Sequence, residues 1–143
     1  MDNSSCPFCY PQLLVNQQVV LENEQARFLQ LDEAKQSGIP LEGAGVIVTK
    51  AHRVSPFDIT DEEWLAIKDI LHKAKFIIDE NHKPSGYNVG WNSGEVAGQH
   101  VNHAHLHLLP RYENEQMAGK GIRYLFKSSL NSRTEKEEGE IRF

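Results

Sequence analysis

Four of the seven histidines in this chain lie within one short segment, GQHVNHAHLHLLPR at residues 98–111. Three of them, His103, His105 and His107, are separated by single residues. Because alternate residues of a strand lie on the same face, this spacing predicts a row of imidazoles along one side of a sheet. Such a row can bind a metal ion, perform covalent chemistry on a substrate, or form part of an ordinary polar surface.

Strand geometry argues against one metal ion bound by all three histidines. Alternate Cα atoms on a strand lie about 6.6–7 Å apart, so the outer two histidines are separated by roughly 13 Å. Zinc–nitrogen bonds are only about 2.0–2.1 Å long, and a straight strand cannot easily bring all three rings to one ion. A neutral imidazole is instead a competent nucleophile near neutral pH, because its unperturbed pKa of about 6.5 leaves a nitrogen lone pair available.

The residues before the row offer hydrogen-bond donors for an anion. The segment NSGEVAGQ at residues 92–99 is rich in small residues, whose backbone N–H groups can approach an anion closely. Asn92, Ser93 and Gln99 add neutral side-chain donors. A nucleophilic histidine beside such donors suits chemistry on a phosphate group.

Cys6 and Cys9 form a second motif, CPFC. In a cytosolic protein such a pair is a metal half-site, a redox pair or a coincidence rather than a structural disulfide. A redox pair needs a strand before it and a helix N-terminus that lowers the thiol pKa, and only five residues precede Cys6. A zinc site needs four ligands, of which this pair supplies two.

The elements that must position these residues are predicted from periodicity. Short β-rich or apolar runs predict strands at residues 17–23, 26–31, 44–50, 86–92 and 102–109, the last closed by Pro110. Thr60 and Glu63 form a capping box, which predicts a helix start. The helix then shows an apolar stripe of Trp64, Ile67, Leu71, Ala74 and Ile78. One long helix against five mostly antiparallel strands is an α+β fold.

The length and charge of the chain restrict the classes of protein it can belong to. A chain of 143 residues suits one domain, which we place at residues 1–131, followed by a charged tail at 132–143. The formal net charge of −5 argues against general nucleic-acid binding. No apolar run is long enough to cross a membrane and the first residues carry no secretory signal, so we expect a cytoplasmic protein with no membrane partner.

The Gly-Gln loop, the alternating row and the Pro-Arg ending together resemble the signature of the histidine triad (HIT) superfamily. The resemblance extends to the segments VIVTKAHRVSPFDITDEEW and GYNVGWNSGEVAGQ, and it covers about residues 6 to 112. It implies a five-stranded, mostly antiparallel sheet with one long helix and a shorter one. Family members of this size are usually homodimers, so the resemblance also implies a ten-stranded sheet built from two copies.

The resemblance implies roles for individual residues. His105 would be the nucleophile that attacks an α-phosphate and forms a nucleotidyl-histidine intermediate, which water later cleaves. His107 would contact the phosphate and assist the leaving group. Asn92 and Gln99 would hold phosphate oxygens, with the hydroxyl of Ser93 nearby.

Two positions depart from the family pattern. His100 stands where nucleotide-binding members commonly carry a small hydroxyl residue, and a histidine there would bring positive charge or a different leaving-group preference to the phosphate. Members also carry an acidic residue for the ribose hydroxyls between the second and third strands. That segment is longer here, and Asp32 is the nearest candidate.

The resemblance also bears on the cysteines. Some bacterial and transferase-like members complete a zinc site with a histidine after the third strand and the first histidine of the triad, which are His52 and His103 in this chain. A structural zinc ion bound by Cys6, Cys9, His52 and His103 is therefore expected, with no organic cofactor.

These assignments imply a nucleotide hydrolase or nucleotidyltransferase, with hydrolysis favoured. The expected reaction is cleavage at the α-phosphate of nucleoside phosphoramidates or dinucleoside polyphosphates, with a purine nucleotide as the expected substrate. A nucleotide-sensing or interaction protein with little catalysis is the alternative from another class. A metallohydrolase with zinc in the histidine row is a third hypothesis.

Overall fold

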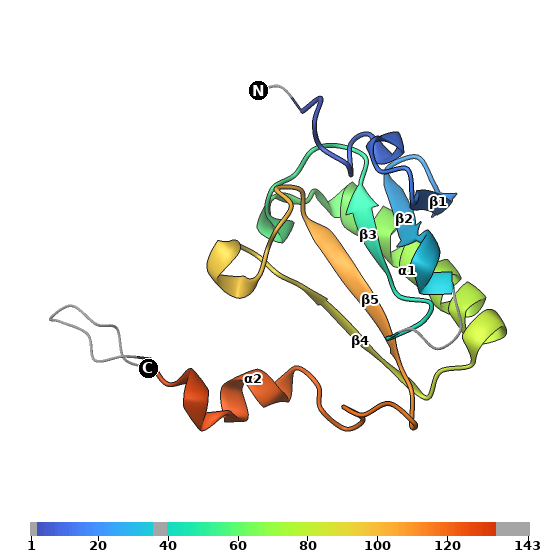
Figure 1. Ribbon diagram of the computed structural model, residues 1–143. Helices are drawn as coiled ribbons and strands as arrows, with labels where there is room; N and C mark the ends of the chain where they lie inside the picture. Colours follow the sequence, from blue (N-terminus) through green and yellow to red (C-terminus); the bar gives the residue numbers. More distant parts are fainter. Residues whose placement is uncertain (1–2, 36–39, 134–143) are drawn as a thin grey trace, which may run out of the picture.

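The computed structural model describes residues 3–35 and 40–133, which form five strands, two α-helices and several short 3-10 turns. The strands and helices are β1 (Gln17–Glu22), β2 (Ala26–Leu31), β3 (Gly45–Thr49), α1 (Asp61–His82), β4 (Gly86–Trp91), β5 (His105–Arg111) and α2 (Arg123–Lys127). The strands form one sheet in the order β1-β2-β3-β5-β4, and every neighbouring pair is antiparallel (Figure 1). The predicted α+β fold, with one long helix and a shorter one, is confirmed.

Helix α1 begins at the predicted capping box. The Thr60 hydroxyl accepts a hydrogen bond from the Glu63 N–H at 3.1 Å, and the Glu63 carboxylate accepts one from the Thr60 N–H at 2.9 Å. The same buried carboxylate accepts a hydrogen bond from the Arg53 guanidinium at 3.0 Å. Burial alone would raise the pKa of Glu63, but the hydrogen bonds from Thr60 and Arg53 outweigh burial and hold that pKa below its ordinary value.

The buried side of α1 packs against one face of the sheet. Its apolar stripe meets side chains of β2, β3 and β5 in one core cluster, which includes Ile67, Ile70, Ala74, Ile78, Phe28, Ile47, Leu106 and Leu108. Leu71 and Trp64, both predicted for the stripe, lie at its margin. Trp64 is 41% exposed and packs edge-on against Trp91 of β4, with 5.4 Å between ring centroids.

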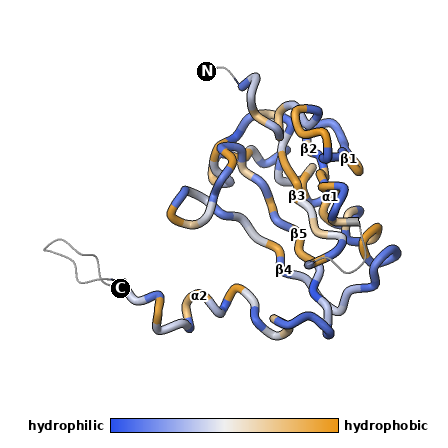
Figure 2. Tube along the Cα trace, viewed as in Figure 1, coloured by the Kyte–Doolittle hydropathy of each residue, from blue (hydrophilic) through white to orange (hydrophobic). Residues whose placement is uncertain are grey.

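The opposite face of the sheet carries a smaller apolar cluster and two histidines. Because strand side chains alternate, Leu29 of β2 and Val48 of β3 point away from α1, and Phe8 of the N-terminal segment packs on them. Hydrophobic and hydrophilic residues also alternate along β5 (Figure 2). Leu106 and Leu108 enter the core under α1, whereas His105 and His107 lie on the face that Phe8 covers.

The fifth strand differs from the prediction at both ends. It begins at His105 rather than at residue 102, and it continues past Pro110. The Ala104 N–H donates to the carbonyl oxygen of Arg53 at 2.6 Å, so the chain before His105 bonds to the loop after β3 and not to the sheet. His103 therefore lies outside the strand, and the alternation on β5 involves only two of the three histidines.

The chain after β5 leads away from the sheet to α2 (Figure 1). Arg111 fixes the start of this segment, because its guanidinium donates to the Glu115 carboxylate at 2.7 Å and to the Met117 carbonyl oxygen at 2.9 Å. The domain predicted at residues 1–131 stays a prediction, and the predicted tail lies outside the described residues from position 134 onward. Within the described ranges, no helix is long and apolar enough to cross a membrane.

Candidate functional site

His105 and His107 lie side by side on β5, with 4.8 Å between ring centroids. The Nδ1 atom of His105 lies 2.8 Å from the carbonyl oxygen of His103, and that of His107 lies 3.2 Å from the carbonyl oxygen of Gly90. A carbonyl oxygen can only accept, so in each ring Nδ1 carries the proton and donates. In its neutral form, each ring therefore has its lone pair on Nε2.

Burial favours the neutral form of His105. This side chain is 7% exposed, and its removal from water lowers its pKa below the ordinary value. The hydrogen bond to the His103 carbonyl acts in the opposite direction, while the neighbouring His107 and His100 lower the pKa further. The imidazole of His105 is thus unprotonated at Nε2 around neutral pH.

The loop between β4 and β5 is braced by Gln99. The Nε2 atom of this buried residue donates to the carbonyl oxygens of Val54 at 2.8 Å and Val101 at 3.0 Å, and its Oε1 accepts from the Gly94 N–H at 2.8 Å. These bonds use both amide hydrogens of Gln99. Its phosphate-binding role stays a prediction, and the contacts give Gln99 a structural role in the loop.

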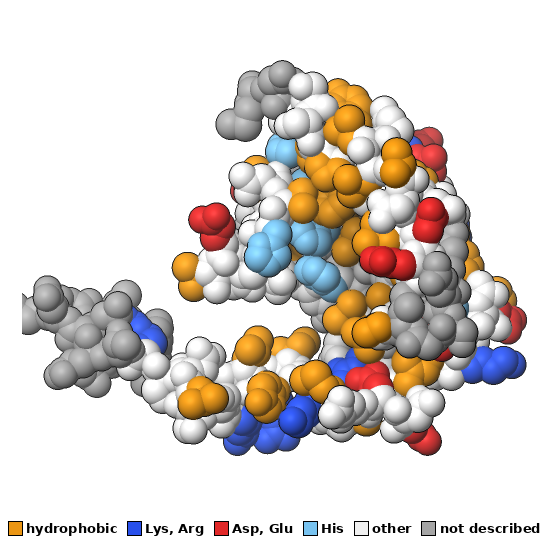
Figure 3. Space-filling model, viewed as in Figure 1, with side chains coloured by type: hydrophobic (Ala, Val, Ile, Leu, Met, Phe, Trp, Pro, Cys, Tyr) orange, Lys and Arg blue, Asp and Glu red, His pale blue; other side chains and the backbone are white. Residues whose placement is uncertain are grey.

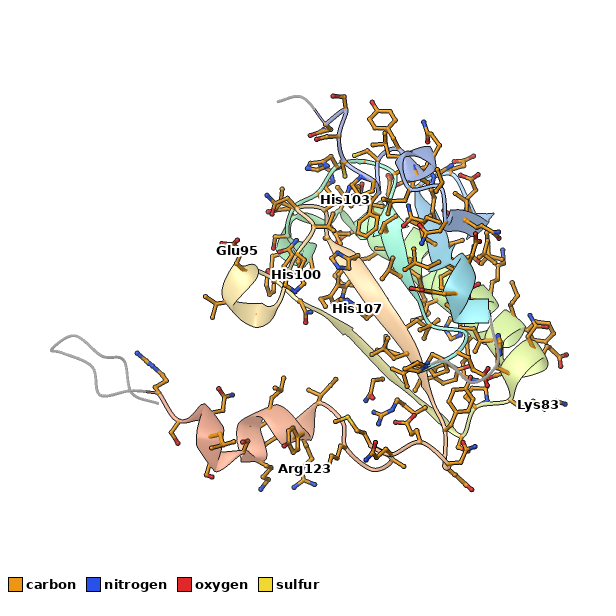
Figure 4. All side chains as sticks on the ribbon, viewed as in Figure 1. Lys83, Glu95, His100, His103, His107 and Arg123 are labelled. Atoms are coloured by element: carbon orange, nitrogen blue, oxygen red, sulfur yellow. The ribbon has the colours of Figure 1, made fainter. Side chains whose placement is uncertain are left out.

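The other predicted phosphate-binding residues are accessible on the same loop. Asn92 is half-buried and donates to a loop carbonyl at 3.4 Å, while Ser93 and His100 are exposed. His100 and His107 lie on the same side of the sheet (Figure 4), and the histidines line a hollow beside apolar side chains (Figure 3). The phosphate-binding roles assigned to Asn92, Ser93 and His100 remain predictions.

An apolar pocket of about 620 Å³ opens beside His107. Its walls are formed by Phe8 and by apolar side chains of β2, β3 and β5, and Glu33 is the acidic residue among those that line it. Asp32 is not among the residues that line it, and its carboxylate accepts a hydrogen bond from Gln18 at 2.7 Å. The structure thus brings Glu33 to the pocket, at the residue next to the predicted Asp32.

Cys6, Cys9, His52 and His103 meet at one point, and their ligand atoms all lie within 4.8 Å of one another. The Nδ1 atom of His103 is 3.5 Å from both sulfur atoms, and that of His52 is 3.2 Å from the Cys9 sulfur. Tetrahedral bonds of about 2.0–2.3 Å to nitrogen and sulfur would place ligand atoms roughly 3.5 Å apart. The four residues can therefore hold one metal ion.

The ring of His103 is oriented for this cluster by a hydrogen bond on its other nitrogen. Its Nε2 lies 2.8 Å from the carbonyl oxygen of Thr49 and carries the proton, so the lone pair on Nδ1 faces the sulfur atoms. The side chain is fully buried, and this burial lowers the pKa of His103 to about 4. A neutral ring is the form that binds a metal. In the described part of the chain, no other group of three or more such residues is close enough to share an ion, which argues against a metal bound by the whole row.

Comparison with known proteins assigns the family. Residues 14–114 match the HIT domain. This chain belongs to the HIT family. An uncharacterized HIT-like protein of Mycoplasma genitalium is 36% identical over 125 residues, which are 85% of this chain and 80% of the relative. A Candida albicans protein named adenosine 5'-monophosphoramidase is 30% identical over 129 residues, covering 84% of this chain and 78% of the relative.

The HIT fold is also found among solved structures. The crystal structure of a HIT family protein from Bacillus anthracis matches this chain with a TM-score of 0.68 and 28% sequence identity. The match covers 92% of this chain and 87% of that chain. The sheet and the two helices are therefore those of the family to which the sequence pointed.

Phe8 and Glu33 are site residues that the sequence did not single out. The Phe8 ring makes edge contacts with His103 and His105, at 5.9 and 5.0 Å between centroids, and it lines the pocket. The available signal was the position of an aromatic residue inside the CPFC motif. For Glu33 the signal was a second acidic residue next to Asp32.

Proposed function

We propose that this HIT protein cleaves nucleoside phosphoramidates or dinucleoside polyphosphates at the α-phosphate, through a nucleotidyl-histidine intermediate on His105. The observation that carries the proposal is the orientation of His105, whose Nδ1–H is bonded to a carbonyl oxygen and whose Nε2 lone pair is available. The activity named for the Candida albicans relative supports a nucleotide substrate. The apolar pocket beside His107 suits a purine base.

The reaction would proceed in two steps. Nε2 of His105 attacks the α-phosphorus, and the bond from phosphorus to the leaving nitrogen or oxygen breaks as His107, which enters this step protonated on both ring nitrogens, donates its Nε2 proton to that atom. Water then attacks the phosphorus and gives its proton to His107. The phosphorus–nitrogen bond to His105 breaks, which releases the nucleoside monophosphate and restores a neutral imidazole. An acceptor other than water would make the same chemistry a transfer reaction.

The substrate contacts follow the predicted assignments, except that Glu33 is added and Gln99 is assigned to the loop rather than to the phosphate. We assign phosphate oxygens to Asn92, Ser93 and His100, whose side chains are exposed or half-buried beside β5. The ribose hydroxyls would meet Glu33, which lines the pocket, with Asp32 next to it at the same end of β2. Gln99 would act chiefly by fixing the loop.

We also propose that the metal is zinc, bound by Cys6, Cys9, His52 and His103. Two thiolates and two imidazoles form a ligand set typical of structural zinc sites. Because four protein ligands leave no open position on a tetrahedral ion, zinc would supply a cross-link between the N-terminal segment and the sheet. Catalysis would remain with His105 and His107.

A cytoplasmic homodimer completes the proposal. Strand β4 is one edge of the sheet, and pairing with β4 of a second copy would extend five strands to ten. Two unpaired cysteines that serve as metal ligands suit a reducing compartment. Light scattering should give twice the 16.3 kDa mass of the chain.

The test of the mechanism is to trap the intermediate. Adenosine phosphoramidate or a diadenosine polyphosphate, labelled at the α-phosphate, is mixed with the protein and quenched rapidly in alkali. We expect label on the wild-type protein and none on His105→Asn, whose turnover should fall about a thousandfold or more. The matched control is His72→Asn, an exposed histidine of α1, which should behave as wild type. Turnover by His105→Asn at the wild-type rate would refute the mechanism, and nucleotide binding without wild-type turnover would favour a sensing role.

A further inference from the structure

Phe8 connects the candidate metal site to the candidate nucleotide pocket. It lies between Cys6 and Cys9 in the chain, and it lines the pocket. The residue is 7% exposed, and its ring makes edge contacts with His103 and His105. One aromatic side chain therefore contacts a metal-site residue, the candidate nucleophile and the space for the substrate.

The turn that carries Phe8 is defined by the cysteines. The Cys9 N–H donates to the Cys6 sulfur at 3.4 Å, which closes the CPFC segment into a turn. This turn directs Phe8 toward the sheet, where the ring packs with Leu29 and Val48. The place of the ring thus depends on where the two sulfur atoms are held.

Few other bonds hold this turn against the sheet. Gln17 donates to the Pro7 carbonyl oxygen at 3.0 Å, and the Arg27 guanidinium donates to that of Phe8 at 3.5 Å. Both donors come from half-buried side chains at the sheet surface. The cysteines, by contrast, approach two histidines that follow β3 and precede β5, so a metal ion bound by the four residues would tie the turn to both of these segments.

We propose that Phe8 is a positioning residue through which metal binding builds the nucleotide pocket. When the cysteines are held by the metal, Phe8 packs against His105 and completes the pocket wall. When the cysteines are released, Phe8 leaves the sheet, the pocket widens and His105 loses a packing partner. Nucleotide affinity then depends on a metal that does not contact the nucleotide. This inference rests on the proposed nucleotide function.

The experiment compares Phe8→Ala with the matched control Phe76→Ala, which alters a phenylalanine on α1 that is 66% exposed. Zinc content is measured by elemental analysis, and AMP affinity by calorimetry, before and after treatment with a chelator. We expect Phe8→Ala to bind one zinc ion per chain and to bind AMP about tenfold more weakly than wild type. Chelation should weaken AMP binding of the wild type about tenfold, and that of Phe8→Ala less than about twofold, because the two changes remove the same contact.

A second readout needs no nucleotide. The ring-proton NMR signals of His105, assigned with His105→Asn, report the aromatic ring packed against them. They should shift in Phe8→Ala and in chelated wild type, and stay in place in Phe76→Ala. If Phe8→Ala does not fold, Phe8→Leu is used in its place. This variant should bind zinc and keep much of the wild-type affinity for AMP, while the His105 NMR signals still shift.

The outcomes separate this inference from the proposed function. Equal weakening of AMP binding by chelation in wild type and Phe8→Ala would overturn the inference. The inference would also be overturned if the His105 NMR signals do not shift on chelation, or if the wild-type chain binds no zinc. If the zinc-loaded wild type binds no AMP while the His105 signals still respond to chelation, the nucleotide function fails and the positioning of Phe8 by the metal stands.

Discussion

A substitution at Gln99 can show whether this residue braces a loop or binds a phosphate. The substitution Gln99→Leu preserves the approximate size of the side chain but removes two donors and one acceptor. The carbonyl oxygens of Val54 and Val101 and the N–H of Gly94 then lose the partners that they have at 2.8–3.0 Å. The loop that carries Asn92 would lose its internal brace.

The structure sets the size of the expected loss. A buried polar group left without a partner costs about 1–3 kcal/mol. Gln99 is 5% exposed, but its hydrogen bonds to the three backbone groups, which belong to two different loops, are only partly buried. We therefore expect Gln99→Leu to lower the free energy of unfolding by about 2–3 kcal/mol, which corresponds to a melting temperature roughly 6–9 °C lower for a chain of this size.

Urea denaturation followed by circular dichroism measures this loss, and calorimetry measures AMP affinity in parallel. Gln116→Leu, at an exposed glutamine, is the control and should change the free energy of unfolding by less than about 0.5 kcal/mol. If Gln99→Leu is as stable as this control but binds AMP about tenfold more weakly, Gln99 is a phosphate ligand and the reasoning from its loop contacts is wrong.

Three further predictions concern stability and metal binding. Gly98 has a φ of +101° and a Cβ there would lie 3.2 Å from a side-chain amide nitrogen, so Gly98→Ala should cost about 1–2 kcal/mol in urea denaturation. At Gly86 an added Cβ would have no neighbour within 4 Å, so Gly86→Ala should leave the free energy of unfolding nearly unchanged. Equal losses of unfolding free energy in the two glycine variants would contradict this account. Burial acts to raise the pKa of Glu63, yet its hydrogen bonds keep that pKa below the ordinary value. The contribution of the Glu63 carboxylate to the stability of the fold is therefore complete above about pH 4.5 and is lost as the pH falls through the folded-state pKa. Wild type should therefore lose more stability than Glu63→Gln between about pH 5 and pH 3, and parallel pH profiles would disprove this. Native mass spectrometry should show that Cys9→Ser has lost zinc while His107→Asn keeps one ion per chain, and the reverse result would place the metal in the histidine row.

The three histidines of the row differ in the ring nitrogen that donates a hydrogen bond to a backbone carbonyl, and this difference separates the metal-site histidine from the two on the substrate side. His103 donates from Nε2 to the Thr49 carbonyl, which leaves Nδ1 for the metal cluster. His105 and His107 donate from Nδ1 to backbone carbonyls, which leaves Nε2 for the substrate side. Backbone carbonyl oxygens thus select the tautomer of each ring and with it the chemistry available to that ring.

Features with local causes could be predicted from the sequence alone. The capping box of Thr60 and Glu63 fixes the start of α1 because both partners lie within one turn. The strands were predictable from short apolar runs, and His105 and His107 share a face because alternation is a property of any strand. The family resemblance gave the metal set that includes Cys6, which local periodicity could not have supplied.

The contacts between distant segments, in contrast, became known only from the packing of the whole chain. His103 lies before the strand, where Ala104 bonds to Arg53 in the loop after β3, and no local pattern encodes a contact between segments so far apart in the chain. Phe8 reaches His105 because a cysteine turn is held against strands far along the chain, and Glu33 reaches the pocket because of the path that the chain takes after β2. Local periodicity specifies which way a side chain points along its own element, whereas the residue that it meets depends on how the elements pack.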